Sequence, residues 1–163
     1  MNRWQPIALV VLLFWVAAAL QVKAVQSLTI FGARPDFLLV VAVSVSVLHR
    51  PGTAAGMGGI AGFLQGVISG ANLAHYVVSR AVAAFAVGHV SKLELDVRSG
   101  YVGLMAVGAT IIAQVLLMIF APQPEFWSFI QATILTALYN GVLAIPVYAL
   151  LRRAFRKHMD SAL

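Results

Sequence analysis

Cysteine and acidic residues are the side chains that this chain has least of. Its 163 residues include no cysteine and only five Asp and Glu. Without thiols the chain can form no disulfide, no thiolate metal site and no cysteine nucleophile. Five carboxylates also leave few combinations for catalysis by paired acids. The composition therefore argues against several common ways of building an enzyme active site.

Motifs for catalysis, cofactors and metals are also missing. The sequence has no phosphate-binding loop, no dinucleotide fingerprint and no zinc-protease helix, and its four histidines do not stand at metal-ligand spacings. Ser69 followed by His75 is the nearest approach to a nucleophile with a base. A loop serine and an interfacial histidine explain that pair more simply. We therefore expect no enzyme, no catalytic residues, no cofactor and no metal site.

Hydrophobic residues dominate what is present. They make up 61% of the chain, charged residues make up 10%, and the mean hydropathy is +0.93. These values lie far from those of soluble globular domains. A chain of this length also fits one compact domain rather than two. The sequence therefore predicts an all-α integral membrane protein, a single transmembrane domain over residues 1–163.

Six apolar segments are interpreted as membrane-spanning helices of one compact bundle. The valine-rich second segment is also interpreted as a helix, because an isolated strand cannot satisfy its backbone in lipid. We expect Pro35 in its first turn, with Asp36 placed to favour the helix dipole. Its length of about 21 Å is short for a ~30 Å hydrocarbon core, so it must tilt little, start deep or be partly shielded by other helices. The expected spans are 4–22, 35–48, 52–69, 72–90, 101–120 and 126–151.

Basic residues set the expected orientation. Six spans place both termini on one side, with residues 152–163 as a basic tail. With a cytoplasmic amino terminus, eight basic residues lie inside, Lys23 and Arg34 lie outside, and Arg80 lies within the membrane. This bias predicts cytoplasmic termini, and it fits membrane topology better than nucleic-acid binding. The inside residues are Arg3, Arg50, Lys92, Arg98, Arg152, Arg153, Arg156 and Lys157.

Glycines recur at every fourth position of the third expected span. Gly58, Gly62, Gly66 and Gly70 therefore form a smooth stripe along one side of a helix. In lipid, small residues at this spacing let another helix backbone approach closely. We expect a helix-packing surface rather than a flexible hinge. Either an internal neighbour, such as the fourth or sixth span, or the anchor helix of a partner fills it, and we slightly favour the internal neighbour.

Arg80 is the residue that most requires a partner. It stands about eight residues into the span 72–90, where an unpaired arginine costs at least ~2.5 kcal/mol. Asp36, at the outer end of the second span, is the expected counter-charge. A buried pair or an anionic ligand site is one interpretation. The other is an arginine that extends to the lipid headgroups.

Polar residues also share one face of the last span. Thr133, Thr136 and Asn140 follow the i, i+3, i+7 spacing of a helix. Hydrogen bonds between helices explain this face better than a substrate path does. Asn140 is therefore expected to be a buried polar residue, as Arg80 is.

A series of short motifs resembles the rod shape-determining protein MreD family. In order along the chain, the motifs are Arg34-Pro35-Asp36, His49-Arg50, Gly62, Ile68-Ser69-Gly70 and Leu73. The resemblance covers residues 34–91 well, and the remainder in size, hydropathy and basic tail. In the family an aspartate commonly stands four residues after the position of Gly62, where this chain has Gly66. A glycine is also common at the position of Ala74.

The resemblance implies a non-enzymatic membrane subunit of the bacterial elongation machinery. Members of the family are similar in architecture to the six-helix substrate-binding subunits of energy-coupling-factor vitamin transporters. They work in the cytoplasmic (inner) membrane with MreC, the actin-like MreB filament, and the wall synthases RodA and its partner transpeptidase. The implied role is to bind MreC and to support peptidoglycan synthesis and cell shape, with membrane lipid as the surroundings.

Two other classes of function remain open. One is a small-molecule-binding subunit of a vitamin-type transporter, with Arg80, Gln65, Asn72 and Asn140 as ligand contacts. It requires a cavity lined by those groups and a coupling surface for an ATPase. The other is a membrane enzyme that acts on lipid, which requires a convergent acid or base that the sequence does not offer.

Overall fold

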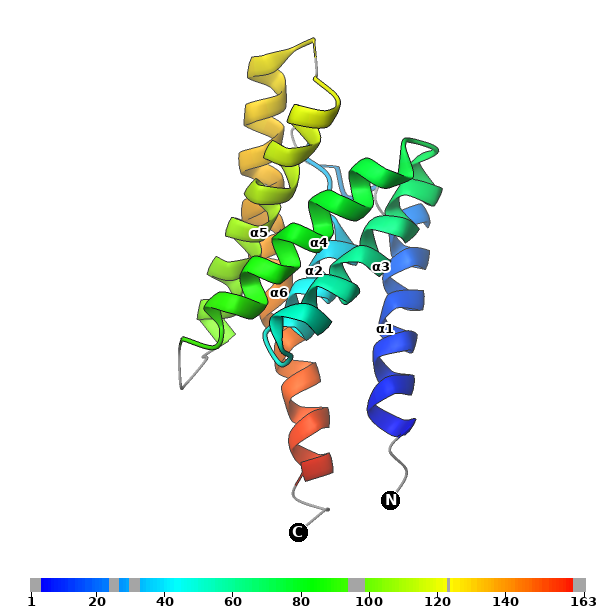
Figure 1. Ribbon diagram of the computed structural model, residues 1–163, viewed down its shortest axis with the longest axis vertical. Helices are drawn as coiled ribbons and strands as arrows, with labels where there is room; N and C mark the ends of the chain where they lie inside the picture. The colour runs from blue at the N-terminus through cyan, green and yellow to red at the C-terminus, as the bar shows by residue number, and fades with distance from the viewer. Residues whose placement is uncertain (1–3, 24–26, 30–32, 94–98, 123, 160–163) are drawn as a thin grey trace.

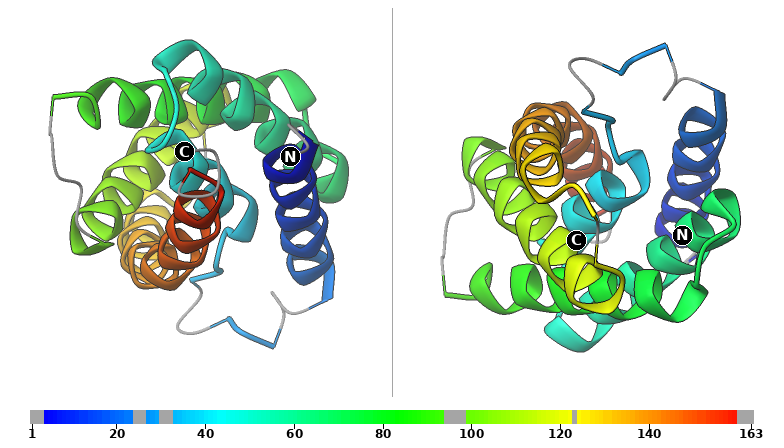
Figure 2. Two further views of the ribbon diagram at one scale, coloured as in Figure 1. Left: turned by 90° about the horizontal axis from the view of Figure 1, so that it is seen from below. Right: turned by 90° about the horizontal axis from the view of Figure 1, so that it is seen from above.

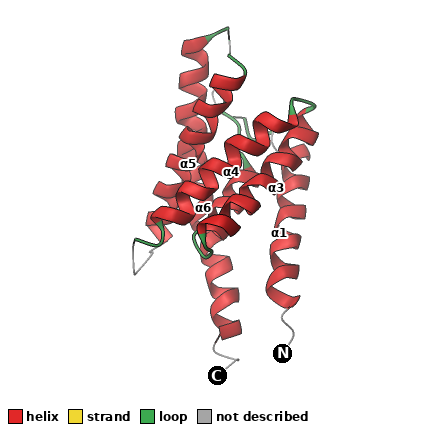
Figure 3. Ribbon diagram, in the orientation of Figure 1, coloured by secondary structure: helices red, strands yellow, loops and turns green. Residues whose placement is uncertain are grey.

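The computed structural model describes residues 4–23, 27–29, 33–93, 99–122 and 124–159. In this part of the chain the secondary structure consists of six helices (Figures 1 and 3). The all-helical fold and the number of segments agree with the sequence. The helices are α1 (Trp4–Lys23), α2 (Phe37–Ser46), α3 (Pro51–Ser69), α4 (Leu73–Val90), α5 (Ser99–Phe120) and α6 (Phe126–Met159).

The short helix α2 lies inside the bundle and contacts each of the other five helices. Seen along the long axis, α3 and α4 cover one side of it, α5 and α6 a second side, and α1 a third (Figure 2). Every residue from Leu38 to Ser46 is buried. A helix of 10 residues is about 15 Å long, well short of a hydrocarbon core. Enclosure by its neighbours, one of the outcomes expected for this segment, is what the structure shows.

The boundaries of α2 differ from the expected span 35–48. The helix begins at Phe37, so Pro35 precedes it instead of standing in its first turn. Asp36 is the N-cap, and its Oδ1 accepts a hydrogen bond from the Leu39 N–H at 2.9 Å. A side chain that caps the first turn fixes the start of a helix there. The dipole argument placed Asp36 at the correct end of the helix, but the helix starts two residues later than expected.

In the turn between α3 and α4, the end of the first helix and the start of the second are capped in different ways. Gly70 ends α3 in the left-handed conformation, with φ of 64°, which glycine adopts at little cost. Asn72 then caps α4 by accepting from the Ala74 N–H at 3.0 Å. Gly70 therefore ends α3. A Cβ built at Gly70 would have no atom within 4 Å other than those of its neighbours in the chain. Its place in the expected packing stripe was wrong.

The other three glycines of the stripe lie against α4. A Cβ built at Gly58 would be 2.6 Å from the Cβ of Ala84, and one at Gly62 would be 2.6 Å from the Cα of Val77. At Gly66 it would be 3.1 Å from the Cα of Leu73. Distances this short show that the two helix backbones touch where side chains are missing. The internal neighbour is thus the fourth helix, and this face offers no groove to a partner.

Helix α6 is longer than the expected span 126–151. It continues to Met159 and comprises 34 residues, about 51 Å of helix. The basic tail over 152–163 is therefore helical as far as the structure describes it, and it extends beyond the rest of the bundle (Figure 1). Apolar contacts explain the extension, because Leu151 is fully buried and Phe155 packs on the cluster around α1 and α2.

Three helices within the described residues are long and apolar enough to cross a membrane: Leu73–Val90, Gly100–Phe120 and Phe126–Phe155. Two shorter apolar helices, Ile7–Lys23 and Phe37–Ser46, accompany them. The glycine-rich α3 belongs to neither group. The six expected spans are thus helices that differ in length and hydrophobicity, and three of them are long and apolar enough to cross a membrane on their own.

The chain direction alternates along the bundle (Figure 1). The start of α1, the turn between α2 and α3, and the ends of α4 and α6 lie at one end of the molecule. Four described basic residues belong to these segments: Arg50, Lys92, Arg152 and Arg153. Lys23 and Arg34 belong to the other end. Of the expected inside residues, Arg3 and Arg98 lie outside the described part of the chain, as do the side chains of Arg156 and Lys157.

Candidate functional site

Asp36 is the centre of a polar network at the amino end of α2. Its backbone N–H donates to Asn140 Oδ1 on α6 at 2.9 Å, and Asn140 Nδ2 donates to Thr110 Oγ1 on α5 at 3.0 Å. Thr110 in turn donates to the Ala106 carbonyl of its own helix at 2.7 Å. Asn140 is fully buried, so these bonds satisfy it inside the bundle. Asn140 thus makes a hydrogen bond between helices of the kind favoured for the polar face of α6, whereas Thr133 of the same face lines a cavity.

Two further contacts hold the segment before α2. Gln21 on α1 donates through Nε2 to the Pro35 carbonyl at 3.3 Å and accepts from the Phe37 N–H at 2.9 Å. The Arg34 N–H donates to Thr136 Oγ1 at 3.4 Å. Residues 34–37 are therefore fixed by side chains of α1 and α6 together. The Arg34-Pro35-Asp36 motif therefore links the start of α2 to α1, α4 and α6.

Arg80 on α4 forms an ion pair with Asp36, its expected counter-charge. Its Nη2 donates to Asp36 Oδ2, and both side chains are almost entirely buried, at 4% and 10% exposure. The guanidinium also lies over the Tyr76 ring, 4.9 Å from the ring centroid, a favourable cation–π contact. The pair excludes the alternative in which Arg80 extends to the headgroups. Two donors of Arg80, Nε and Nη1, have no hydrogen-bond partner among the described residues, and neither does the buried Gln65 Oε1.

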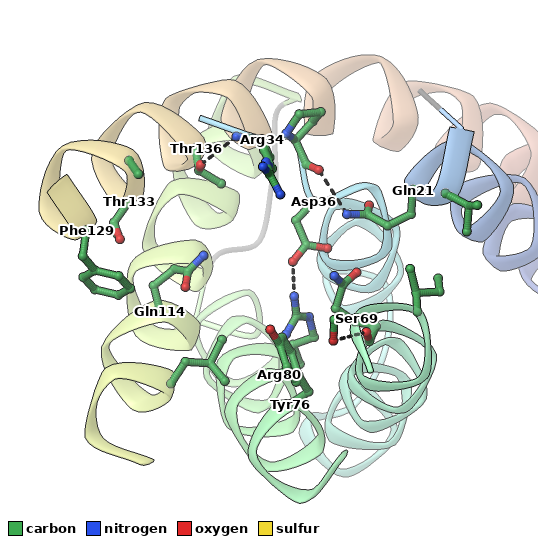
Figure 4. Close-up of a pocket in the computed structure, with 16 residues that line it drawn as sticks. Gln21, Arg34, Asp36, Ser69, Tyr76, Arg80, Gln114, Phe129, Thr133 and Thr136 are labelled. Carbon is green, nitrogen blue, oxygen red and sulfur yellow. Dashed lines mark hydrogen bonds and ion pairs between the residues drawn. The ribbon is translucent and has the colours of Figure 1, made fainter. Parts of the chain in front are cut away.

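These residues line a cavity of about 540 Å³. Tyr76 and Arg80 on α4 face Asp36, while Gln114, Phe129 and Thr133 form the wall contributed by α5 and α6 (Figure 4). The other lining residues are Gln21, Val22, Arg34, Pro35, Gln65, Ile68, Ser69, Leu117, Ala132 and Thr136. The cavity lies among the ends of α1 and α3 and the beginnings of α2 and α6. This is the end of the bundle opposite Arg50, which precedes α3, and opposite Arg152 and Arg153 of α6.

The structure brings together some of the expected site residues and separates others. Arg34, Pro35, Asp36, Ser69 and Arg80 all line the cavity. Asn140 lies behind it, bonded to the backbone of Asp36.

The second motif, His49-Arg50, lies at the far end of α2. The Nδ1 atom of His49 is 2.8 Å from the Val45 carbonyl, and the His49 ring meets the edge of Phe155. Arg50 is the exposed N-cap of α3. The two motifs therefore mark opposite ends of the one buried helix, and Gly58, Gly62 and Gly66 belong to the α3–α4 contact.

The geometry does not assemble a nucleophile with a base from Ser69 and His75. The Ser69 hydroxyl donates to the Gln65 carbonyl at 2.8 Å, and the His75 ring stacks on Phe120 with centroids 5.3 Å apart. Among the described residues, no three His, Asp or Glu side chains are grouped so that they could hold a metal ion. What the cavity offers is a charged pair with polar side chains around it, which is an arrangement for binding.

The sequence analysis missed two residues of the network and three packing glycines. Gln21 stands near the end of an apolar helix, where only its unfavourable position in lipid could have drawn attention to it. Thr110 shares a face of α5 with Gln114 at i+4 spacing, which is a signal of the kind used for α6. Gly103 and Gly141 let α5 and α6 approach closely, and Gly88 lies against Ala54 of α3. These glycines lack the four-residue repeat of α3, so the spacing gave no signal for them.

A second concave surface differs sharply in character. A groove of about 600 Å³ runs between α1 and α3, and its lining is almost entirely apolar. The residues are Ile7, Val10, Val11, Phe14, Trp15, Ala18, His49, Met57, Ile60, Leu64 and Phe155. We refer to it below as the α1–α3 groove.

Apolar helices, three of them long enough to cross a membrane, together with a polar cavity between their ends, are typical of a helical membrane protein. The chain matches the family model for rod shape-determining protein MreD over residues 1–156. It therefore belongs to the MreD family, a family of shape-determining membrane proteins. No curated protein and no solved structure gives a significant match.

Proposed function

We propose that this chain is a non-enzymatic subunit of the rod-shape machinery that binds MreC in the bacterial cytoplasmic membrane. Through MreC it would be linked to MreB, RodA and the partner transpeptidase, and so support peptidoglycan synthesis and cell shape. The match to the MreD family over residues 1–156 carries this proposal. The described residues add a polar cavity that is large enough for a small ligand.

The α1–α3 groove is our proposed seat for the single anchor helix of MreC. The glycine face of α3 is closed by α4, so a partner helix must use another surface. The lining of the groove is almost wholly apolar, with Ile60 and Trp15 partly exposed at 49% and 74%. Helices associate in lipid through close packing, which a groove between two helices provides. An apolar anchor helix therefore fits this surface better than it fits the polar cavity.

Co-purification from native membranes tests the proposal. We expect the wild-type chain to retain MreC and wall synthases. Ile60→Trp should fill part of the groove and lower the amount of MreC retained. Val82→Trp is the matched control, because Val82 is exposed on α4 at 44% and does not line the groove. If both variants retain MreC as the wild type does, the groove is not the contact surface, and if the wild type retains no MreC, the proposed function itself fails.

The cavity favours a second candidate, a small-molecule-binding subunit of a vitamin-type transporter. A volume of about 540 Å³ suits a small ligand. Arg80 and Gln65 line it as that hypothesis requires, but Asn140 does not, and Asn72 caps α4 beside a smaller pocket. The architecture expected from the family resemblance, similar to the six-helix substrate-binding subunits of energy-coupling-factor transporters, is also consistent with this second candidate. Retention of ATPase subunits in place of MreC would favour it.

A further inference from the structure

We infer that the polar cavity binds a single anionic group, a carboxylate or a phosphate, on the free donors of Arg80. This goes beyond the proposed function, which places MreC in the α1–α3 groove. The ion pair with Asp36 uses only Nη2, while Nε and Nη1 are buried and have no partner among the described residues. Leaving buried donors of a charged group unpaired is costly.

The charge of the lining sets the sign of the ligand. Arg34, Arg80 and Asp36 are the charged residues around the cavity, so the lining has a net positive charge. The guanidinium of Arg80 is held on one side by Asp36 and on its face by Tyr76. Nε and Nη1 do not share a two-donor edge of the guanidinium, so each can donate a separate, charge-assisted hydrogen bond to an oxygen of a carboxylate or phosphate. Because the Arg80 side chain is only 4% exposed, its attraction for an anion is stronger than that of an arginine at the surface.

The remaining wall defines the rest of the ligand. Gln114 and Thr133 lie across the cavity from Arg80, with Phe129 beside them (Figure 4). These neutral groups suit a ligand whose remaining part, away from the anionic group, is partly polar and partly aromatic or aliphatic. Gln65 Oε1, which is buried without a partner, is an acceptor for a hydroxyl or amide of the ligand. The ligand class is thus a small molecule or lipid headgroup with one anionic group and at least one hydrogen-bond donor.

Thermal unfolding of the purified full-length chain in detergent tests the inference without MreC, so its result does not depend on the proposed function. The soluble probe is benzoate, compared with its neutral amide benzamide. The lipid probe is dihexanoyl phosphatidylglycerol, compared with dihexanoyl phosphatidylcholine. We expect an anionic probe, and not its matched control, to raise the unfolding midpoint in a saturable way. The probe that does so identifies the source of the anionic group.

Arg80→Lys is the critical variant, because a lysine keeps a positive charge for Asp36 but loses the two free guanidinium donors, Nε and Nη1. It should weaken binding of the effective probe by roughly tenfold or more. Arg50→Lys makes the same change at an exposed residue outside the cavity and should leave binding unchanged. Thr133→Phe leaves the ion pair intact and fills the cavity, so it should also abolish the shift.

Three results would overturn the inference. The first is that neither anionic probe raises the midpoint more than its neutral or zwitterionic control. The second is that Arg80→Lys and Thr133→Phe, both folded, respond as the wild type does. The third is that Arg80→Lys lowers retention of MreC while no anionic probe binds. In that case the cavity receives a side chain of the partner protein, and no small anion is involved.

Discussion

Single residues at the start of α2 determine how the helices are joined. Asp36 serves three partners with three different groups: Oδ1 caps Leu39, Oδ2 binds Arg80, and the N–H binds Asn140. Asp36 is buried, with 7% of the whole residue exposed. A carboxylate in such a position is stable because each of its oxygens has a donor. Asp36 thus combines the cap of one helix with links to two others.

Asp36→Asn should destabilise the bundle strongly. An asparagine retains an oxygen for the Leu39 N–H but removes the charge, which leaves Arg80 buried without a counter-ion. Loss of one partner of a buried pair typically costs roughly 3–5 kcal/mol. The expected result is a lower thermal unfolding midpoint of the purified protein. Glu125→Gln, at an exposed acid in the α5–α6 connection, is the control and should cause little change.

The double variant Asp36→Leu with Arg80→Leu checks the reason for that loss. Replacement of a whole buried pair by apolar residues of similar volume is often nearly neutral. The double variant should therefore recover much of the stability that Asp36→Asn loses. If the double variant is no more stable than the single one, an unpaired charge is not the cause.

At the scale of helices, the pattern of side-chain size decides which pairs approach closely. The α3–α4 pair makes the most extensive contact in the bundle, and it does so through Gly58, Gly62 and Gly66. Gly66 stands where members of the family often have an aspartate, and here it packs against Leu73. A larger residue at that position would have to displace Leu73 from the first turn of α4.

Gly62→Leu should weaken the contact between α3 and α4. The backbone of α4 occupies the space that a side chain would need, because Val77 Cα is 2.6 Å from a Cβ built at Gly62. Overpacking of a tight contact typically costs roughly 1–3 kcal/mol, which should appear as a lower unfolding midpoint in detergent. Gly56→Leu on the same helix is the control, because nothing lies within 4 Å of its Cβ. Equal stability of the two variants would show that the glycine face is not a packing surface.

At the scale of the whole molecule, local patterns in the sequence predicted the elements, and the missing parts depend on distant neighbours. Hydropathy located six helices. The cost of an isolated charge in lipid predicted that Arg80 pairs with Asp36, 44 residues earlier in the chain. The extension of α6 to Met159 was not predictable in this way, because it depends on the contacts of Leu151 and Phe155 with α1 and α2. Gln21 was missed for the same reason, since its partners are backbone groups that only the folded chain brings near.

The distribution of charge leads to the orientation in the membrane, the last prediction. One end of the bundle contains the turn before α3, the ends of α4 and α6, and the start of α1 (Figure 1). The basic residues of these segments are Arg50, Lys92, Arg152 and Arg153. Under the positive-inside rule this end faces the cytoplasm. A green fluorescent protein fused after the last residue should therefore fluoresce. Alkaline phosphatase inserted in the connection 121–125 should be active, because that connection lies at the opposite end.

A fusion at the turn between α2 and α3 makes this test stricter. With 10 residues, α2 is too short to cross a hydrocarbon core alone, and only its enclosure by five neighbours lets the chain return to the basic end. Fluorescent protein inserted at that turn should therefore also report the cytoplasm. An active phosphatase at the carboxyl terminus would reverse the orientation. An active phosphatase at the turn alone would show that α2 does not carry the chain across, and the six-crossing topology would then be wrong even with both termini inside.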